Sequence, residues 1–306
     1  MNAKIKGTLC GIISAITYGL NPLGALNLYR DGLNVDSVLF YRYGLAMIVL
    51  AGLMRRRKVP FKAGGRELAL CLFLGTILAV SSFCLYRSFN YMDAGLACTV
   101  LFVYPVMVAV IMAVLFKERL TGLTVLSIIM ALTGIALLYR GGDGAALNGF
   151  GVALVILAAL SYAVYMVTVN KSGLKLPPLT LTFYVMLFGI MVIVLHSLSA
   201  EEYHLQWLTS PSQWLWALML AVVPTVMSMV LMVMAIKEIG TTPTAIMGAL
   251  EPVTAVVIGV TVFSESFSSR IALGMLLILA AVSLIIAEKP LIRKLKQRRY
   301  QGGGID

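Results

Sequence analysis

The sequence predicts an all-α integral membrane protein with ten transmembrane helices, arranged as two inverted five-helix repeats. Three observations predict this fold class: an apolar composition, ten apolar stretches of membrane-spanning length, and a similarity between the two halves of the chain. Of the 306 residues, 60% are hydrophobic and only 12% are charged, whereas soluble globular domains carry roughly 25% charged residues. Most of the chain is therefore expected to lie in lipid.

A helix needs about 20 apolar residues to cross the hydrocarbon core of a bilayer. Ten stretches of the chain meet this requirement, and the connections between them are too short to hold a soluble domain. The predicted spans are 5–28, 36–54, 67–88, 93–116, 120–139, 147–169, 178–197, 213–236, 241–263 and 268–287.

The basic residues predict the orientation of these spans. Nineteen of the 24 Lys and Arg residues fall on the same side as the N-terminus, four fall on the opposite side, and Arg42 lies within a span. Because Lys and Arg accumulate in cytoplasmic segments, both termini are expected in the cytoplasm, which requires an even number of spans. The same distribution accounts for the net charge of +11, and nucleic acid is not an expected partner.

The two halves of the chain resemble each other. A shift of about 144 residues aligns 14–19 with 158–163, and a shift of about 147 aligns Ser81 with Ser228. The second shift also places Tyr104-Pro105 on Glu251-Pro252. Since the matches include Tyr and Pro, an internal repeat is favoured over chance similarity between apolar helices.

These matches predict a first repeat over 1–142, a second over 146–290 and a basic cytoplasmic tail over 291–306. Each repeat has an odd number of spans, so the second is inserted upside down. Inverted repeats are a construction of many secondary transporters, whose substrate site lies between the repeats.

Polar residues inside the spans mark the predicted site. In the first span, Tyr18 and Asn21 share one helical face, and Tyr162 and Tyr165 do so in the sixth. Polar side chains in lipid normally face a cavity or a partner. Helix–helix packing is the alternative explanation. The candidate substrate-binding or cavity residues are Tyr18, Asn21, Arg42, Ser81, Tyr104, Tyr162, Tyr165, Ser228 and Glu251.

Two of these candidates, Arg42 and Glu251, carry charge well inside a span. Each is costly at that depth unless it is paired or hydrated. A carboxyl at mid-membrane could exchange a proton or bind the amine of a substrate, or it could stabilise the bundle through neighbouring hydroxyls. Pro105 and Pro252, at matching places in the fourth and ninth spans, predict helix kinks.

The sequence lacks the residues and motifs that other classes of function require. The four cysteines lie in apolar stretches without a CxxC pair, so no metal site or cofactor is expected. Only two histidines are present, and no hydrolase or metalloprotease motif occurs. Nothing indicates a channel selectivity filter. Gly7 and Gly11 form a GxxxG pair, which favours close packing within the bundle over a dimer interface.

Three segments carry a resemblance to a known family: FYRYGLAMIVLAGL at 40–53, LACTVLFVYPVMVAVIMAVLFKERL at 96–120 and ALEPVTAVVIGVTVFSE at 249–265. The chain resembles the EamA-type branch of the drug/metabolite transporter superfamily over nearly its whole length. The glutamate–proline pair that the family has in its ninth span matches Glu251-Pro252. The family's glutamates after the fourth and ninth spans match Glu118 and Glu265.

The resemblance implies alternating access around a cavity formed by both repeats. It implies export of an amino acid or related metabolite across the plasma membrane, which is the inner membrane of a bacterium. A nucleobase, vitamin or drug transporter of the same fold is the alternative. The expected partners are a small-molecule substrate and the lipid bilayer, with protons as a candidate coupling ion and a monomer or weak homodimer as the assembly.

Overall fold

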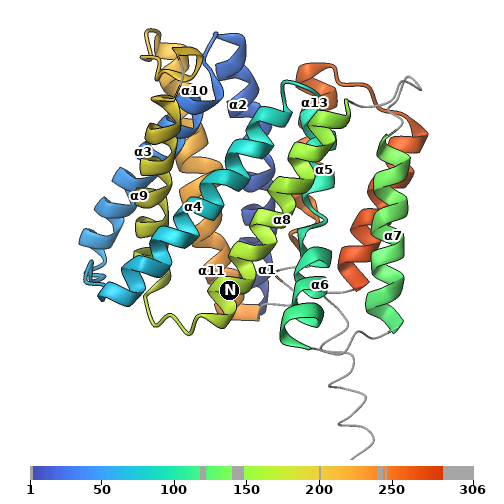
Figure 1. Ribbon diagram of the computed structural model, residues 1–306, viewed down its shortest axis with the longest axis horizontal. Helices are drawn as coiled ribbons and strands as arrows, with labels where there is room; N and C mark the ends of the chain where they lie inside the picture. The colour runs from blue at the N-terminus through green and yellow to red at the C-terminus, as the bar shows by residue number, and fades with distance from the viewer. Residues whose placement is uncertain are drawn as a thin grey trace, which may run out of the picture.

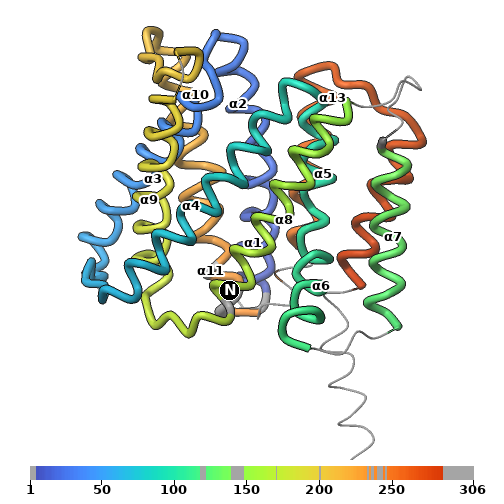
Figure 2. Tube along the Cα trace, in the orientation of Figure 1, coloured from blue at the N-terminus to red at the C-terminus, as the bar shows by residue number. Residues whose placement is uncertain are grey.

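The computed structural model describes residues 3–117, 122–139, 148–199, 201–239, 244 and 247–284. Three predicted features lie outside the described residues: Glu118, the junction between the repeats at 142–146, and the basic tail 291–306. The described part is built from helices that run side by side as one bundle (Figures 1 and 2).

The helices follow the predicted spans. The first half contains α1 (Ala3–Gly19), α2 (Asn21–Arg30), α3 (Val35–Arg56), α4 (Gly65–Ser88), α5 (Ala94–Leu101), α6 (Tyr104–Phe116) and α7 (Gly122–Tyr139). The second half contains α8 (Gly149–Lys171), α9 (Pro178–Ser197), the short η1 (Glu201–Tyr203), α10 (Pro211–Ala221), the π-helical η2 (Val222–Met227), α11 (Ser228–Ile239), α13 (Leu250–Phe263) and a last described helix, Ser269–Leu284.

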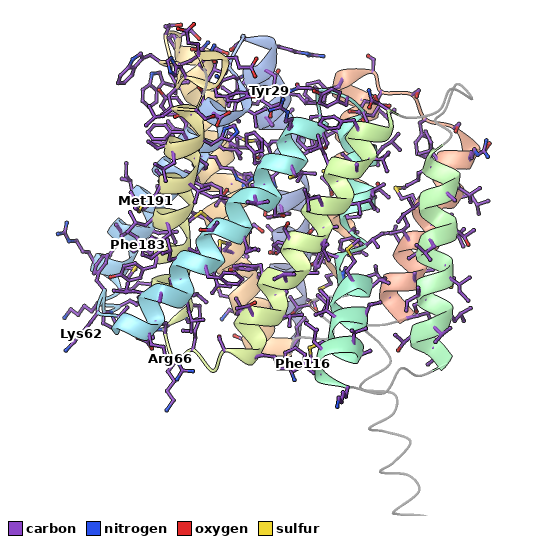
Figure 3. The ribbon with its side chains drawn as sticks, in the orientation of Figure 1. Tyr29, Lys62, Arg66, Phe116, Phe183 and Met191 are labelled. Atoms are coloured by element: carbon purple, nitrogen blue, oxygen red, sulfur yellow. The ribbon has the colours of Figure 1, made fainter. Side chains whose placement is uncertain are left out.

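Seven of these helices or continuous helix pairs are long and apolar enough to cross a membrane, and three shorter apolar helices accompany them. The pairs α1–α2 and α5–α6 each form one span. Apolar side chains such as Ile48, Val114 and Leu195 are exposed on the bundle surface, and Met191 points away from it (Figure 3). The predicted all-helical membrane fold is confirmed.

Polar residues at the helix starts explain where several helices begin. The Asn34 side chain accepts a hydrogen bond from the Ser37 backbone N–H (2.9 Å) before α3, and Asn148 does the same for Phe150 (2.9 Å) before α8. Ser210 and Gln213 form a reciprocal capping box before α10. Such caps satisfy N–H groups that have no partner within the helix.

Matching hydrogen bonds demonstrate the repeat. Ser228 donates its hydroxyl to the Ser14 carbonyl (3.0 Å), where α11 packs along α1. Ser81 donates to the Ala158 carbonyl (2.8 Å), where α4 packs along α8. These four residues are partners in the sequence repeat, so both halves pack the same helix pair with the same bond.

A second pair of contacts shows that the halves are inverted. Tyr41 donates its hydroxyl to the Gln206 carbonyl (3.2 Å) in the connection before α10. Tyr184, which follows Phe183 in the second half as Tyr41 follows Phe40 in the first, donates to the Phe61 carbonyl (2.7 Å) in the connection before α4. These connections lie at opposite ends of the bundle, with α10 at the top and Lys62 at the bottom of the views (Figures 1 and 3). Equivalent contacts at opposite ends require an upside-down second repeat.

The glycine pair Gly7 and Gly11 lies where α1 meets the second repeat. A Cβ at Gly7 would stand 2.7 Å from side-chain atoms of Glu238 and Ile239, and one at Gly11 would stand 2.6 Å from the Met247 sulfur. Real Cβ atoms do not come this close to a neighbour, so glycine is required at position 7, whereas at position 11 the end of the flexible Met247 side chain would have to shift. The expected packing within the bundle is confirmed.

The fourth and ninth spans are interrupted in the same place. Helix α5 ends at Leu101 and α6 begins at Tyr104, while the turn Gly248–Ala249 precedes α13. Pro105 and Pro252 lie in the first turn after each interruption, where backbone N–H groups have no helical partner, so the N–H that proline lacks costs no hydrogen bond. Each span is thus interrupted just before its proline, which is a larger departure from a continuous helix than the predicted kink. Interrupted helices at matching places in two repeats are typical of secondary transporters.

Glu265 joins the end of the ninth span to the start of the fourth. Its carboxylate accepts hydrogen bonds from the backbone N–H groups of Ala94 (2.8 Å) and Gly95 (3.1 Å), the first residues of α5. A Cβ at Gly259 would overlap the same carboxylate. Glu265 therefore caps α5, and glycine at 259 leaves the room for it.

Candidate functional site

Arg42 organises a hydrogen-bonded group between α3, α4 and η2. Its Nε donates to Thr225 Oγ1 (3.1 Å), and its Nη1 donates to the Tyr86 hydroxyl (2.9 Å). Tyr86 in turn donates to Asn21 Oδ1 (3.2 Å). All four residues are buried. The Arg42 guanidinium thus links α3, α4 and η2, and through Tyr86 it is also connected to the break between α1 and α2.

No described carboxylate pairs with Arg42, whose neighbours are hydroxyls and rings. Its guanidinium carbon lies 5.3 Å from the Tyr86 ring centroid and 6.0 Å from that of Tyr43. The negative faces of aromatic rings attract a cation, and this attraction grows when water is excluded. The charge of Arg42 is therefore stabilised without an acidic partner.

Tyr18 lies between the two charged residues of the spans. Its side chain lies within electrostatic range of both Arg42 and Glu251. Helix α1 ends one residue later, at Gly19, where a Cβ would stand 2.6 Å from the Glu251 carbonyl oxygen. This close approach of α1 to α13 brings the two charges into one region.

Glu251 is in the first turn of α13, beside the interruption of the ninth span. Tyr104 and Tyr162 lie within electrostatic range of its carboxyl. Among the residues that the structure describes, its carboxyl has no hydrogen-bond donor and no cationic partner. The nearby Thr254 hydroxyl donates to the Leu250 carbonyl (2.8 Å) instead. Glu251 is thus a part-buried acid left open to a proton or a cationic group.

Three tyrosines form a continuous aromatic wall beside Glu251. The rings of Tyr104 and Tyr162 meet edge to face with centroids 4.7 Å apart. Tyr162 and Tyr165 stack with centroids 5.8 Å apart. The wall joins α6 to α8 and hence the first repeat to the second. Tyrosine offers an apolar face and a polar tip, which suits a small solute with both kinds of group.

Together these side chains form what we term the interior cluster. Its members are Tyr18, Asn21, Arg42, Tyr86, Tyr104, Tyr162, Tyr165, Thr225 and Glu251.

Seven of the nine predicted site residues belong to the interior cluster, and two do not. Ser81 and Ser228 are buried at the α4–α8 and α1–α11 contacts, where their hydroxyls bond to backbone carbonyls. Tyr86 and Thr225 are cluster members that the sequence analysis did not select. Thr225 follows Pro224 in η2. The proline in the eighth span was therefore the sequence feature that could have pointed to Thr225.

The described residues contain no group of three or more His, Cys, Asp or Glu side chains that could hold a metal ion. The cluster instead offers one free acid, one shielded cation and several hydroxyls. Polar groups gathered inside an apolar bundle are typical of a ligand site or a functional site in a membrane protein.

Comparison with known proteins identifies the family. The model of the EamA-like transporter family matches residues 5–140 and again residues 149–287. The chain belongs to the EamA-like transporter family. It is therefore a multi-pass membrane transporter of small molecules, not an enzyme.

Several EamA relatives match over most of their length. An uncharacterized transporter of Archaeoglobus fulgidus is 29% identical over 270 residues, covering 79% of this chain and 95% of the relative. The threonine/homoserine exporter RhtA of Salmonella typhimurium (strain LT2) is 25% identical over 257 residues, 83% of each chain. One crystal structure superposes on 95% of this chain and 99% of its own with a TM-score of 0.64 at 18% identity, which supports the fold alone.

Proposed function

We propose that this EamA-like transporter exports an amino acid or a closely related compound by alternating access, and that Glu251 binds the amine of the cargo. One observation carries the proposal: the Glu251 carboxyl has no partner among the described residues and faces Tyr18, Tyr104 and Tyr162. An ammonium group there would supply the missing counter-charge and donate three hydrogen bonds.

Two further findings support the class and direction of transport. The threonine/homoserine exporter RhtA is similar to this chain over 83% of its length, and both threonine and homoserine carry an amine. The matched interruptions before α6 and α13 give the two repeats equivalent flexible points. Such points suit a bundle whose halves rock around a fixed site.

We also propose that both termini face the cytoplasm, that the protein lies in the plasma membrane and that protons are the coupling ion. The uneven distribution of Lys and Arg supports the orientation. A cysteine at Ser210 is expected to react with an impermeant thiol reagent from outside the cell, and one at Gly65 only from inside. The reverse pattern at either site would reject this orientation.

Transport by the purified protein tests the role of Glu251. In proteoliposomes we expect uptake of L-threonine but not of the hydroxy-acid analogue that lacks the amine. Glu251→Gln keeps the size of the side chain and removes its charge, so transport of L-threonine is expected to fall by about tenfold or more, the effect of a lost charge-assisted hydrogen bond. Glu201→Gln, which neutralises an exposed glutamate of η1, is the matched control.

Equal transport by Glu251→Gln and wild-type protein would show that the carboxyl is structural. The stacked Tyr162 and Tyr165 rings favour the second candidate, a transporter of a nucleobase or another ring compound. In that case uracil, and not L-threonine, would be transported, and Tyr162→Leu would reduce transport more than Glu251→Gln.

A further inference from the structure

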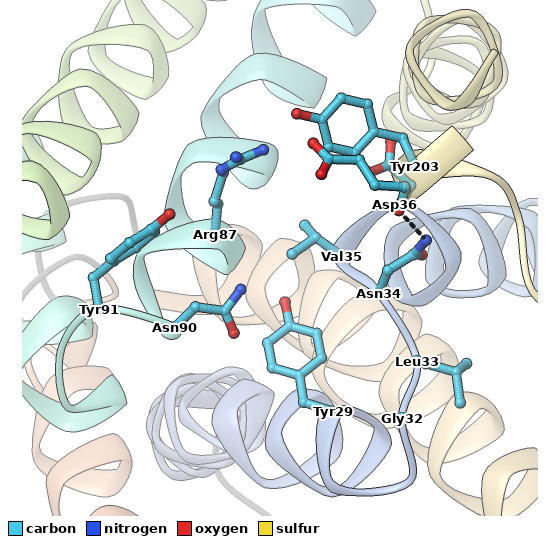
Figure 4. Close-up of a pocket in the computed structure, with 11 residues that line it drawn as sticks. Tyr29, Gly32, Leu33, Asn34, Val35, Asp36, Arg87, Asn90, Tyr91 and Tyr203 are labelled. Carbon is cyan, nitrogen blue, oxygen red and sulfur yellow. Dashed lines mark hydrogen bonds between the residues drawn. The ribbon is translucent and has the colours of Figure 1, made fainter. Parts of the chain in front are cut away.

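A separate pocket of about 340 Å³ opens at the end of the bundle where α2 ends and α3 begins (Figure 4). The last turn of α4, the connection that follows it and η1 complete its walls. We term it the end pocket. None of the nine predicted site residues lines it.

The cation of the end pocket is Arg87, which lies between the rings of Tyr91 and Tyr203 (Figure 4). Both tyrosines lie within electrostatic range of its guanidinium. Its guanidinium carbon lies 5.6 Å from the Tyr203 ring centroid and 5.9 Å from that of Phe83. Arg87 makes no ion pair with any carboxylate that the structure describes. The planar fork of its donors therefore suits a carboxylate.

The opposite wall of the end pocket carries acids. Asp36 lies at the start of α3, and Glu202 is exposed in η1. The Asp36 carboxylate pairs with His196 Nδ1 at 2.7 Å and is 2% exposed, so Glu202 is the acid that a solute can reach. A pocket with an unpaired guanidinium on one wall and a reachable carboxylate on another fits a zwitterion.

The end pocket borders the interior cluster. Tyr29 lines the pocket and donates its hydroxyl to the Tyr86 carbonyl (3.0 Å). Tyr86 precedes Arg87 in α4, and its own hydroxyl contacts Arg42 and Asn21. Tyr86 therefore joins the two sites, through its backbone carbonyl on the side of the end pocket and through its hydroxyl in the interior cluster.

We propose that the end pocket is a second binding site for the zwitterionic cargo, in which Arg87 binds the cargo carboxylate on its way between the interior cluster and solution. This proposal rests on the proposed function for its choice of cargo. In the proposed orientation the end pocket faces outside, so it is the last site that an exported molecule occupies.

Protection of a cysteine in the end pocket from labelling tests this site. Asn90 lines the pocket and is exposed, so Asn90→Cys is expected to react with a maleimide in the detergent-purified protein. The chain without this substitution gives the background from its four native cysteines. L-threonine is expected to slow the reaction, whereas threoninol, which lacks the carboxylate, is not.

The guanidinium is tested in the same assay. Added to Asn90→Cys, Arg87→Gln is expected to raise the half-protecting concentration of L-threonine about tenfold, equivalent to about 1.4 kcal/mol. Arg87→Lys, which keeps the charge and loses the planar fork, is expected to give a smaller rise. Arg30→Gln removes an exposed arginine at the end of α2 that does not line the pocket, and its protection should match the parent.

Unchanged protection in both Arg87 variants would overturn the proposal. So would protection that is lost in Glu251→Gln but kept in Arg87→Gln, because occupancy of the interior cluster alone would then explain it. If L-threonine is transported but gives no protection, the end pocket is rejected as a binding site and the proposed function stands. If L-threonine protects but is not transported, the end pocket stands and the proposed function fails for that cargo.

Discussion

Arg42 and Glu251 are both charged residues inside spans, and the fold surrounds them in opposite ways. Arg42 is 6% exposed and is held by Thr225, Tyr86 and two aromatic rings. Glu251 is only partly buried, and no described residue bonds to its carboxyl. The difference separates a charge that the bundle uses for its own packing from a charge that is available to a cargo or a proton.

The largest stability effect is expected at Arg42. Arg42→Gln removes two hydrogen bonds from a charged donor and leaves the hydroxyls of Thr225 and Tyr86 without their partner. A loss of roughly 3 kcal/mol in the free energy of unfolding follows, since bonds to charged groups contribute about 1.5–3 kcal/mol each. Denaturant unfolding in detergent, followed by tryptophan fluorescence, measures it. A loss as small as that of Glu251→Gln would show that the bundle depends no more on the charge of Arg42 than on that of Glu251.

A smaller effect is expected at Tyr86, whose hydroxyl links Arg42 to Asn21. Tyr86→Phe keeps the ring that faces the guanidinium and removes both hydrogen bonds. The expected loss is about 1–2 kcal/mol, because buried partners are left unsatisfied. Tyr43→Phe is the control, since the Tyr43 hydroxyl bonds to Ser82 of α4 and not to Arg42 or Asn21. An equal loss in the control would show that losing any buried tyrosine hydroxyl in this region has the same effect, whether or not it bonds to Arg42.

Glu265 offers a third case, a carboxylate in a connection outside the spans. Burial raises its pKa above the ordinary value of 4.5, although the N–H groups of Ala94 and Gly95 act in the opposite sense. A pKa that is higher in the folded state gives stability that is complete below 4.5 and is lost as pH rises through the folded value. Relative to Glu265→Gln, the wild-type protein should therefore lose stability as pH rises above 4.5.

The expected difference at Glu265 is at most about 1 kcal/mol, because a half-buried group is partly screened by water. Thermal unfolding of both proteins between acid and neutral pH measures it. Parallel curves for the two proteins would show that the backbone N–H groups of α5 cancel the effect of burial, and a wild-type protein that gains stability as pH rises would show that they outweigh it.

The smallest stability effect is expected at Glu251. Glu251→Gln removes a charge that has no described partner, so its free energy of unfolding should stay within about 0.5 kcal/mol of wild type. The same unfolding assay as for Arg42→Gln gives a direct comparison. A loss above about 1 kcal/mol would reveal a structural bond to the carboxyl and weaken its assignment to the cargo.

The sequence by itself determined the environment, the number of spans and the repeat. Apolar runs of spanning length and the low charge content require a bilayer, and these properties do not depend on how the helices meet. The repeat could be read because matched residues such as Ser81 and Ser228 make the same bond in each half. Helical spacing also placed Tyr18 with Asn21, and Tyr162 with Tyr165, on shared faces.

The tertiary structure alone decided which polar residues meet. Arg42 forms hydrogen bonds with Thr225, 183 positions away in the chain, and with Tyr86, 44 positions away. No periodicity within one span specifies such partners. It also assigned Ser81 and Ser228 to helix contacts, and it left Glu251 open beside the break in the ninth span. Periodicity fixes the face on which a side chain lies, whereas the helix opposite that face is fixed only when the bundle packs.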